Sequence, residues 1–193
     1  MVKIALRPRR ARIALASVAT VAALLGTWLF PGAAQAASSY GTVGNYHSGK
    51  CLDDTNGSTS NGTQMQQWTC LYNSNQEWRI QNWVSYGGTT VYQIQNQKST
   101  KCLDMWGGSP NNGTKVALYT CSTSDDAQLW YLVPTNINGW WDFLNVASKT
   151  CMTVSADSQS NGALIQGWSC ATAGSDHSYF WEPHNWGPLV LCK

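Results

Sequence analysis

Side chains that could carry out catalysis are sparse in this sequence. Beyond residue 36 there are only two glutamates, Glu77 and Glu182, and each stands next to a tryptophan. Hydrolysis of a glycosidic bond, for example, needs two carboxylates about 5 to 10 Å apart. The side chains of neighbouring residues on an extended chain point to opposite sides. We therefore expect the two carboxylates to diverge in Asp53-Asp54 and in Asp125-Asp126. The histidines have no repeated partner, nucleophile motif or metal-ligand spacing: His47, His177 and His184. The sequence therefore predicts no catalytic residue, no metal site and no cofactor.

The first 36 residues are typical of a secretory signal peptide. A basic stretch precedes an apolar run over residues 13–30, and Pro31-Gly32 then breaks any helix. Ala34-Gln35-Ala36 has the small-x-small pattern at which signal peptidases cleave. We expect cleavage near Ala36 and a secreted protein. The alternative is an uncleaved membrane anchor, because the apolar run is close to the minimum spanning length.

Residues 37–193 number 157, a natural size for one domain. Five of the twelve Lys and Arg residues precede residue 37, so seven remain against ten Asp and Glu and the net charge becomes −3. This balance leaves no basic patch, which argues against a nucleic-acid partner and against an anionic membrane as a partner.

The same residues predict an all-β fold. They are rich in Gly, Ser, Thr and Asn, poor in charge, and contain ten of the eleven tryptophans. No segment has the three- and four-residue apolar spacing of a long amphipathic helix. Short runs such as TVYQIQN and TKVALYTC alternate instead between turn clusters, which is typical of strands.

A unit of about fifty residues recurs three times. In each unit two cysteines lie nineteen positions apart, an Asn-Gly pair begins ten positions after the first cysteine, and a tryptophan closes the unit. The closing tryptophans are Trp78, Trp130 and Trp181. Self-similarity this regular predicts three copies of one unit around a shared core.

The constant cysteine spacing in an exported chain predicts one disulfide per repeat: Cys51–Cys70, Cys102–Cys121 and Cys151–Cys170. Zinc ligation is disfavoured, because no CxxC or HxxxH spacing is present. Cys192 stands outside the pattern and has no assigned partner. The pairs Asn61-Gly62, Asn112-Gly113 and Asn161-Gly162 predict tight turns. The first two also match the glycosylation sequon, but the third lacks it, which favours the turn interpretation.

The motifs within the repeats resemble those of the ricin B-chain lectin family. Cys-Leu-Asp occurs at residues 51–53 and 102–104, and Gln-x-Trp at residues 76–78 and 128–130. The third copy departs from both motifs, at Thr153 and Tyr179. The resemblance implies a β-trefoil with pseudo-threefold symmetry, in repeats of about residues 39–86, 87–136 and 137–186, with most recurring tryptophans in the core.

The resemblance also implies a carbohydrate site in the first repeat. A sugar ring has an apolar C–H face and a rim of hydroxyls, so binding it requires an aromatic platform, a carboxylate and amides. Asp53 matches the family's carboxylate and Trp68 its stacking platform. Gln66 and Asn75 match its amide contacts, and Gln76 matches the residue that holds the site together.

The other two repeats retain less of this set. The second keeps Asp104, Tyr119 and Gln128 but has Ala117 and Ala127 where the family has amides, which predicts weaker binding. Trp106 is nearby in sequence, but sequence alone does not place it. The third repeat keeps Gln166 and Trp168 but has no carboxylate at residue 153, so we expect it to be structural.

These observations favour a secreted, non-catalytic carbohydrate-binding protein. The family resemblance implies galactose- or xylan-type sugars, bound mainly by the first repeat. One alternative is a protein-binding β-trefoil, such as an inhibitor or a toxin-associated subunit, which would not need Asp53, Trp68 and Asn75. A glycoside hydrolase is a further alternative, disfavoured by the arrangement of the carboxylates.

Overall fold

The computed structural model describes residues 39–170 and 179–186. The expected signal peptide, His177, Ser178 and Cys192 lie outside these ranges. Every regular element within them is a strand or a short 3-10 turn. Among these residues there is no helix with the length and apolar character needed to cross a membrane. The predicted all-β class is confirmed.

The described strands form three consecutive groups of four. The first group is β1 (Val43–Asn45), β2 (Cys51–Asp54), β3 (Met65–Trp68) and β4 (Trp78–Tyr86). The second is β5 (Thr89–Asn96), β6 (Cys102–Met105), β7 (Thr114–Tyr119) and β8 (Leu129–Pro134). The third is β9 (Trp141–Asn145), β10 (Cys151–Val154), β11 (Ile165–Trp168) and β12 (Phe180–Pro183). The threefold repetition predicted from the cysteines is therefore present in the strands.

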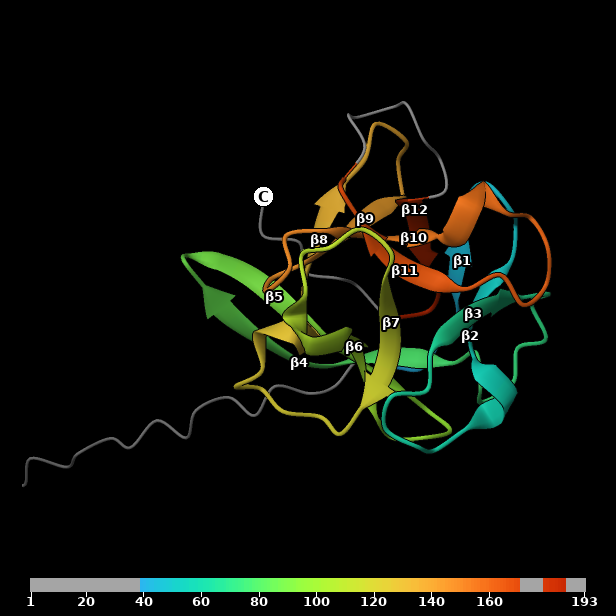
Figure 1. The fold of residues 1–193 in the computed structure, drawn as a ribbon, viewed down its shortest axis with the longest axis horizontal. Helices are drawn as coiled ribbons and strands as arrows, with labels where there is room; N and C mark the ends of the chain where they lie inside the picture. Colours follow the sequence, from blue (N-terminus) through green and yellow to red (C-terminus); the bar gives the residue numbers. More distant parts are fainter. Residues whose placement is uncertain (1–38, 171–178, 187–193) are drawn as a thin grey trace, which may run out of the picture. The chain divides into compact units, whose positions relative to one another are not determined.

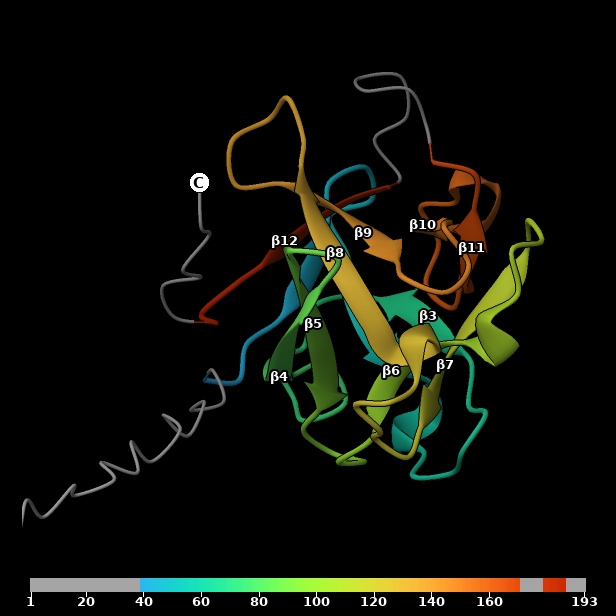
Figure 2. The same ribbon diagram turned by 90° about the vertical axis from the view of Figure 1, so that its left-hand side faces the viewer.

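The first and fourth strands of each group form a closed barrel. Antiparallel pairing runs from β1 through β12, β9, β8 and β5 to β4. The ring closes where Gly41 and Trp78 exchange backbone hydrogen bonds of 2.9 and 2.7 Å. In Figure 1, β1 (blue) and β12 (red), from opposite ends of the described chain, lie side by side. Figure 2 shows β8 crossing between β5 and β9.

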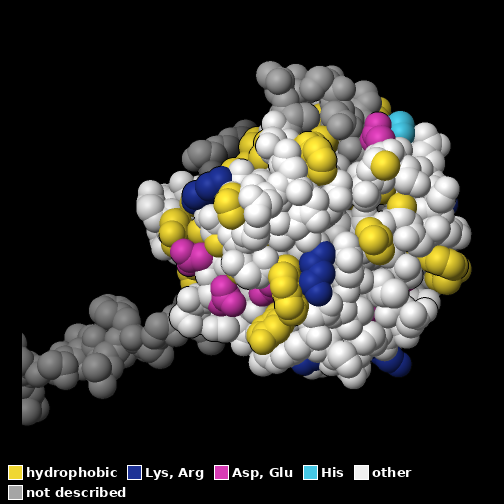
Figure 3. All heavy atoms as spheres, viewed as in Figure 1, with side chains coloured by type: hydrophobic (Ala, Val, Ile, Leu, Met, Phe, Trp, Pro, Cys, Tyr) yellow, Lys and Arg dark blue, Asp and Glu magenta, His cyan; other side chains and the backbone are white. Residues whose placement is uncertain are grey.

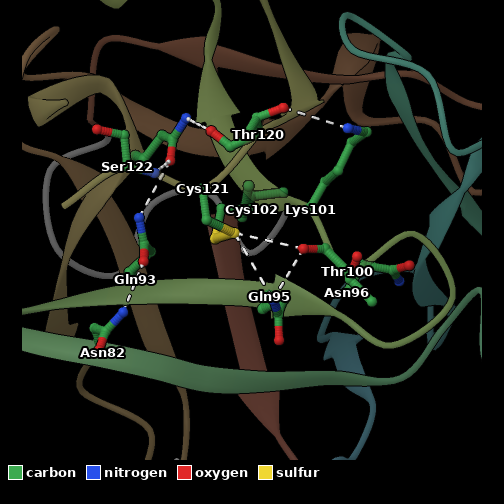
Figure 4. The surroundings of a disulfide bond; sticks show 12 residues. Asn82, Gln93, Gln95, Asn96, Thr100, Lys101, Cys102, Thr120, Cys121 and Ser122 are labelled. Atoms are coloured by element: carbon green, nitrogen blue, oxygen red, sulfur yellow. Dashed lines mark hydrogen bonds between the residues drawn. A yellow bond between two sulfur atoms is a disulfide. The ribbon is translucent and has the colours of Figure 1, made fainter.

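The second and third strands of each group form three hairpins with one register. Cys51 pairs with Trp68, Cys102 with Tyr119 and Cys151 with Trp168. The three predicted disulfides are present, one in each repeat. Each joins the first residue of a hairpin to the segment after its second strand, with Cα atoms 5.0 to 5.1 Å apart. Figure 4 shows the second bridge beside Gln95 and Thr100.

The closing tryptophans lie in the core, as predicted. Trp78, Trp130 and Trp181 are each fully buried. Their indole N–H groups donate to the carbonyls of Leu52, Leu103 and Met152 at 3.1, 3.1 and 2.9 Å. The same contact in all three repeats fastens each hairpin to the barrel, and it satisfies a polar group that burial would otherwise leave unpaired.

The Asn-Gly pairs do more than turn the chain. Only the glycines use the left-handed region, with φ of 82°, 87° and 81°. Each asparagine Oδ1 accepts from the next repeat around the axis: Asn61 from Thr120 Oγ1, Asn112 from Ser169 N and Oγ, and Asn161 from Thr69 N and Oγ1. The three asparagines therefore link the repeats into a ring, which the local turn pattern does not predict.

One residue departs from the symmetry of the core. Asp54 corresponds to Met105 and Val154, the last residues of β6 and β10. Its side chain is fully buried, and within the described part of the chain neither carboxyl oxygen has a hydrogen-bond partner. Burial, with a smaller contribution from the charge of Asp53, raises the pKa of Asp54 to about 7.

Candidate functional site

The hairpin register assigns the site residues to one face. Side chains alternate along a strand, so Asp53 and Gln66, which pair across the first hairpin, share a face with Trp68. Leu52 and Asp54 occupy the opposite face, against the core. Asp53 and Asp54 therefore diverge, as expected for neighbours in a strand.

Asp53 is held by two amides. The residue is only 5 % exposed. Its Oδ1 accepts from Gln66 Nε2 at 2.8 Å and its Oδ2 accepts from Gln76 Nε2 at 3.0 Å. Burial raises the pKa of Asp53, while the two hydrogen bonds oppose that rise. The arrangement fixes the carboxylate at the outer face of the hairpin.

Gln76 lies beneath the carboxylate and is fully buried. Besides Asp53, its Nε2 donates to Thr69 O at 3.0 Å. Its Oε1 accepts from Leu71 N at 2.6 Å and from Tyr72 N at 3.3 Å. The side chain thus ties the segment after β3 to the carboxylate and supports the site without facing solvent.

The remaining two first-repeat residues lie at the surface. Trp68 is 37 % exposed, so its indole does not face the core. The ring stands over the Asn-Gly turn of the third repeat, 3.7 Å from where a methyl group on Gly162 would lie. Asn75 crosses the short turn η1 (Thr55–Gly57), where a methyl group on Gly57 would lie 2.8 Å from its Oδ1. Glycine at residue 57 therefore leaves room for Asn75.

The second repeat positions a carboxylate with one fewer donor. Gln128, corresponding to Gln76, donates from Nε2 to Asp104 Oδ2 at 3.2 Å. Asp104 pairs across the hairpin with Ala117, so its Oδ1 accepts no hydrogen bond from the described residues. Burial, with a smaller contribution from the charge of Asp125, raises the pKa of Asp104 to about 6 against the effect of the Gln128 hydrogen bond.

Two aromatic rings flank this second carboxylate. Trp106 begins the short turn η2 (Trp106–Gly108) and meets Tyr119 edge to face, with centroids 6.2 Å apart. Lys115 Nζ lies 3.7 Å from the Trp106 ring centroid, over its face. A cavity of about 630 Å³ is lined by Asp104, Trp106, Tyr119, Asp125 and Asp126, among others. Trp106 is thus part of the site, as are Asp125 and Asp126, which sequence reasoning considered only as an unsuitable catalytic pair.

The third repeat also has a cavity, of about 400 Å³. Its lining includes Gln166 and Trp168, which sequence reasoning noted, and Asp157, which it missed. Tyr179 takes the place of Gln76, and its hydroxyl donates to Ser169 O at 3.3 Å, replacing one of the glutamine's bonds. The sequence did contain a signal for Asp157, because it is an acidic residue shortly after β10, the first strand of this hairpin.

Charged groups elsewhere in the described part of the chain form no second centre. Among the described residues no group of three His, Cys, Asp or Glu side chains has the geometry of a metal site. Within the described ranges, the charged partner of Glu182 is His184, at 3.3 Å. The face in Figure 3 carries few charged side chains, and its exposed hydrophobic side chains are scattered singly or in small groups.

Residues 27–119, 80–168 and 126–183 match the family model described as ricin-type beta-trefoil lectin domain-like. The chain belongs to this family. The three matches overlap along the repeats, and the β-trefoil expected from the motifs is confirmed.

Solved structures with the same fold are numerous. A designed threefold-symmetric protein, ThreeFoil, is 30 % identical with a TM-score of 0.65, over 75 % of this chain and 96 % of that one. An exo-β-1,3-galactanase from Clostridium thermocellum is 29 % identical with a TM-score of 0.65, over 76 % of this chain but only 30 % of the enzyme. An agglutinin from Rhizoctonia solani is 18 % identical with a TM-score of 0.62, over 76 % and 94 %, and shares the fold.

Proposed function

We propose that this is a secreted, non-catalytic carbohydrate-binding protein that recognises galactose- or xylan-type sugars, mainly through the first repeat. The observation that carries the proposal is the outer face of the first hairpin. There a partly exposed indole, Trp68, shares the face with a carboxylate, Asp53, that two amides hold in place. Three disulfides support an extracellular location.

Each group has a defined part in this function. The C–H face of a pyranose stacks on the Trp68 indole. Neighbouring sugar hydroxyls donate to Asp53, because each oxygen accepts one amide and retains a further lone pair. Gln66 and Asn75 contact the ring's rim, and Gln76 keeps the acid from turning away. A charged acceptor makes these hydrogen bonds stronger than neutral ones.

The second repeat adds a weaker site with a different composition. Asp104 supplies the carboxylate, Tyr119 and Trp106 the aromatic surfaces, and Gln128 the support. A single shallow site of this kind binds with a dissociation constant of about 1 mM. Two sites on one domain raise retention on a polysaccharide through effective concentration.

A glycan array on the protein and its Asp53→Ala variant tests the proposal. We expect galactose- or xylan-type glycans to be retained by the native protein and lost or strongly reduced with Asp53→Ala. Asp53→Asn, which keeps the shape of the residue, separates loss of charge from misfolding, and circular dichroism checks the fold of both. Asp104→Ala is the matched variant in the second repeat and should weaken retention less.

The alternatives predict different results. A protein-binding β-trefoil would retain no glycan and would be indifferent to Asp53→Ala. A glycosidase would release reducing sugar from galactan or xylan, whereas we expect no turnover. Retention that is equal in the native protein and in both Asp53 variants would overturn the first-repeat site.

A further inference from the structure

The cavity of the second repeat contains two acidic residues that have no counterpart in the first repeat. Asp104 lines it from β6, Asp125 from the residue before η3 (Asp126–Gln128), and Asp126 from the start of η3. When Gln76 is aligned with Gln128, the residues of the first repeat that correspond to Asp125 and Asp126 are neutral, an asparagine and a serine. The second cavity is therefore the more negatively charged of the two.

Capping of the turn does not require the charge of Asp125. Asp125 Oδ1 accepts from Ala127 N at 3.0 Å. In the first repeat the neutral Asn73 makes the same contact, since its Oδ1 accepts from Asn75 N at 3.2 Å. Asn and Asp are comparable as caps. The charge at residue 125 thus exceeds what the local fold requires.

Each of the three carboxylates keeps one oxygen that accepts no hydrogen bond from the described residues. Asp104 accepts from Gln128 on Oδ2 only, and Asp125 uses only its Oδ1, in the cap. Asp126 accepts from the hydroxyl of Tyr86 on Oδ2, at 2.9 Å. Asp104 is only 4 % exposed, so a donor for its open oxygen enters through the cavity. Because a buried acceptor without a donor is costly, the cavity favours a ligand that donates hydrogen bonds.

Two lysines lie near this group, but in the described part of the chain neither forms an ion pair with the three carboxylates. Lys115 Nζ donates to Gly62 O at 3.1 Å and lies 3.7 Å from the ring centroid of Trp106. Lys149 Nζ lies 5.8 Å from the ring centroid of Tyr86. Both ammonium groups are thus held against aromatic rings. Three carboxylates against two ammonium groups leave a negative charge that a cationic ligand would balance.

The lining suits an organic cation. Trp106 and Tyr119 are 42 % and 41 % exposed and meet edge to face, with centroids 6.2 Å apart. Aromatic rings attract ammonium groups and also stack on the C–H face of a sugar. The three carboxylates do not form a metal-binding group among the described residues. A cavity of about 630 Å³ instead has room for a ring that carries the charge.

We propose that the second repeat binds a sugar that carries a free, protonated amine. This inference rests on the proposed carbohydrate-binding function and names the substrate class of its second site. The sugar ring stacks on Tyr119 and Trp106, and a hydroxyl donates to the open oxygen of Asp104. The ammonium group faces Asp125 and Asp126, whose open oxygens accept its N–H donors.

The first repeat lacks this preference, because Asn73 and Ser74 stand at the positions of the two additional acids. A polysaccharide that contains both neutral and amine-bearing sugars would therefore engage both sites, each through a different residue of the polymer. Its retention would exceed that of a neutral polysaccharide through effective concentration.

The indole N–H signals of Trp68 and Trp106 report on the two repeats separately. They are assigned with Trp68→Phe and Trp106→Phe in 15N-labelled protein, which is then titrated at pH 7.0 with galactose, galactosamine and N-acetylgalactosamine. This pH lies above the Asp104 pKa of about 6 and leaves the amine largely protonated. We expect galactosamine to shift the Trp106 signal at about tenfold lower concentration than the two neutral sugars. The Trp68 signal should show no such preference.

The double variant Asp125→Asn, Asp126→Asn removes both charges and keeps an acceptor oxygen on each side chain. In this variant galactosamine and galactose should shift the Trp106 signal at about the same concentration. Dispersion of the 15N spectrum checks that it is folded. Glu77→Gln is the control, because it removes a negative charge outside the cavity lining, and it should keep the preference of the native protein.

Several outcomes overturn this inference and leave the proposed function standing. They are an equal Trp106 response to galactosamine and galactose, a preference that survives in the double variant, and a preference lost equally in Glu77→Gln. An equal shift with methylammonium chloride also overturns it, because the cavity would then bind the amine without the sugar ring. A Trp106 preference with no response at Trp68 supports the inference and overturns the first-repeat site. If no sugar shifts either signal, both fail.

Discussion

The first and second repeats hold a carboxylate at the same point of the same hairpin but surround it differently. Asp53 accepts one amide on each oxygen, from Gln66 and from Gln76. In the described structure Asp104 accepts one amide, from Gln128, because Ala117 stands where Gln66 would be. The buried glutamine is common to both repeats, and the outer amide is the part that varies.

This difference shows which part of the site belongs to the fold. Gln76 and Gln128 also bond the backbone that follows each hairpin, so they serve folding whether or not a sugar binds. The outer amide, that of Gln66, donates to the carboxylate and to no other group among the described residues. In the second repeat this amide is missing, and burial, with a smaller contribution from the charge of Asp125, raises the pKa of Asp104 to about 6 against the effect of the Gln128 hydrogen bond.

The largest expected effect tests whether the buried glutamines are equivalent. Gln76→Ala and Gln128→Ala should each lower the free energy of unfolding by about 3 kcal/mol, because each leaves buried polar partners unsatisfied. Urea denaturation measures the loss, and Gln159→Ala, at an exposed residue, is the control. A loss below about 1 kcal/mol in either variant would show that its glutamine does not support the fold.

The first and second repeats also differ on the inner face of the hairpin, where Asp54 in the first repeat corresponds to Met105 in the second. Asp54→Met should stabilise the protein by about 2 kcal/mol at pH 8, because it removes a buried carboxylate that accepts no hydrogen bond from the described residues. The folded-state pKa of about 7 exceeds the ordinary aspartate pKa of 3.8. The stability of the native protein therefore falls as pH rises between these values.

Thermal unfolding at pH 5 and pH 8 checks this prediction. The gain from Asp54→Met should be smaller at pH 5, where folded Asp54 is protonated. The reverse change, Met105→Asp, should destabilise the second repeat. An equal gain at both pH values would show that Asp54 does not titrate between them.

Sugar binding by the second repeat should depend on pH. In a Trp68→Ala background, lowering the pH from 7.5 to 5.0 should weaken the second-repeat affinity about tenfold, since Asp104, with a pKa of about 6, becomes protonated and no longer accepts from sugar hydroxyls. Isothermal titration with lactose or xylobiose measures the change. Constant affinity over this range would mean that the Asp104 carboxylate is not the acceptor.

The smallest expected effects concern the asparagine ring. Asn112→Ala should cost about 1 kcal/mol, because Asn112 accepts two hydrogen bonds from the third repeat. Asn61 accepts one, from Thr120, so Asn61→Ala should cost about half as much. Chemical denaturation gives both values. Equal losses would show that the turn itself, and not the link between repeats, is what each asparagine stabilises.

The repeat pattern was sufficient to predict much of the fold. The nineteen-residue cysteine spacing predicts bridges within the repeats, and the disulfides follow it. The closing tryptophans predict a shared core, and all three are buried. These features were accessible because each concerns residues that the same short unit brings together, three times over.

The sites were only partly predictable, because some of their residues come from segments that no single short unit brings together. Asp53 and Gln66 are paired by one local hairpin, so the sequence motif already implies their contact. Trp106 and Asp125 line the cavity of Asp104 from two separate segments of the sequence. No sequence spacing indicates that Trp106 and Asp125 belong to the same cavity.

The amino-acid sequence alone determined a threefold, disulfide-linked β domain, because its period records which residues must recur. Only the tertiary structure decided that Asp54 is buried with no hydrogen-bond partner among the described residues, and that Asp157 lines the third cavity. Both outcomes depend on the direction of a side chain relative to a barrel that closes between distant strands. That direction follows from strand register and from a left-handed turn, which residue types by themselves do not specify.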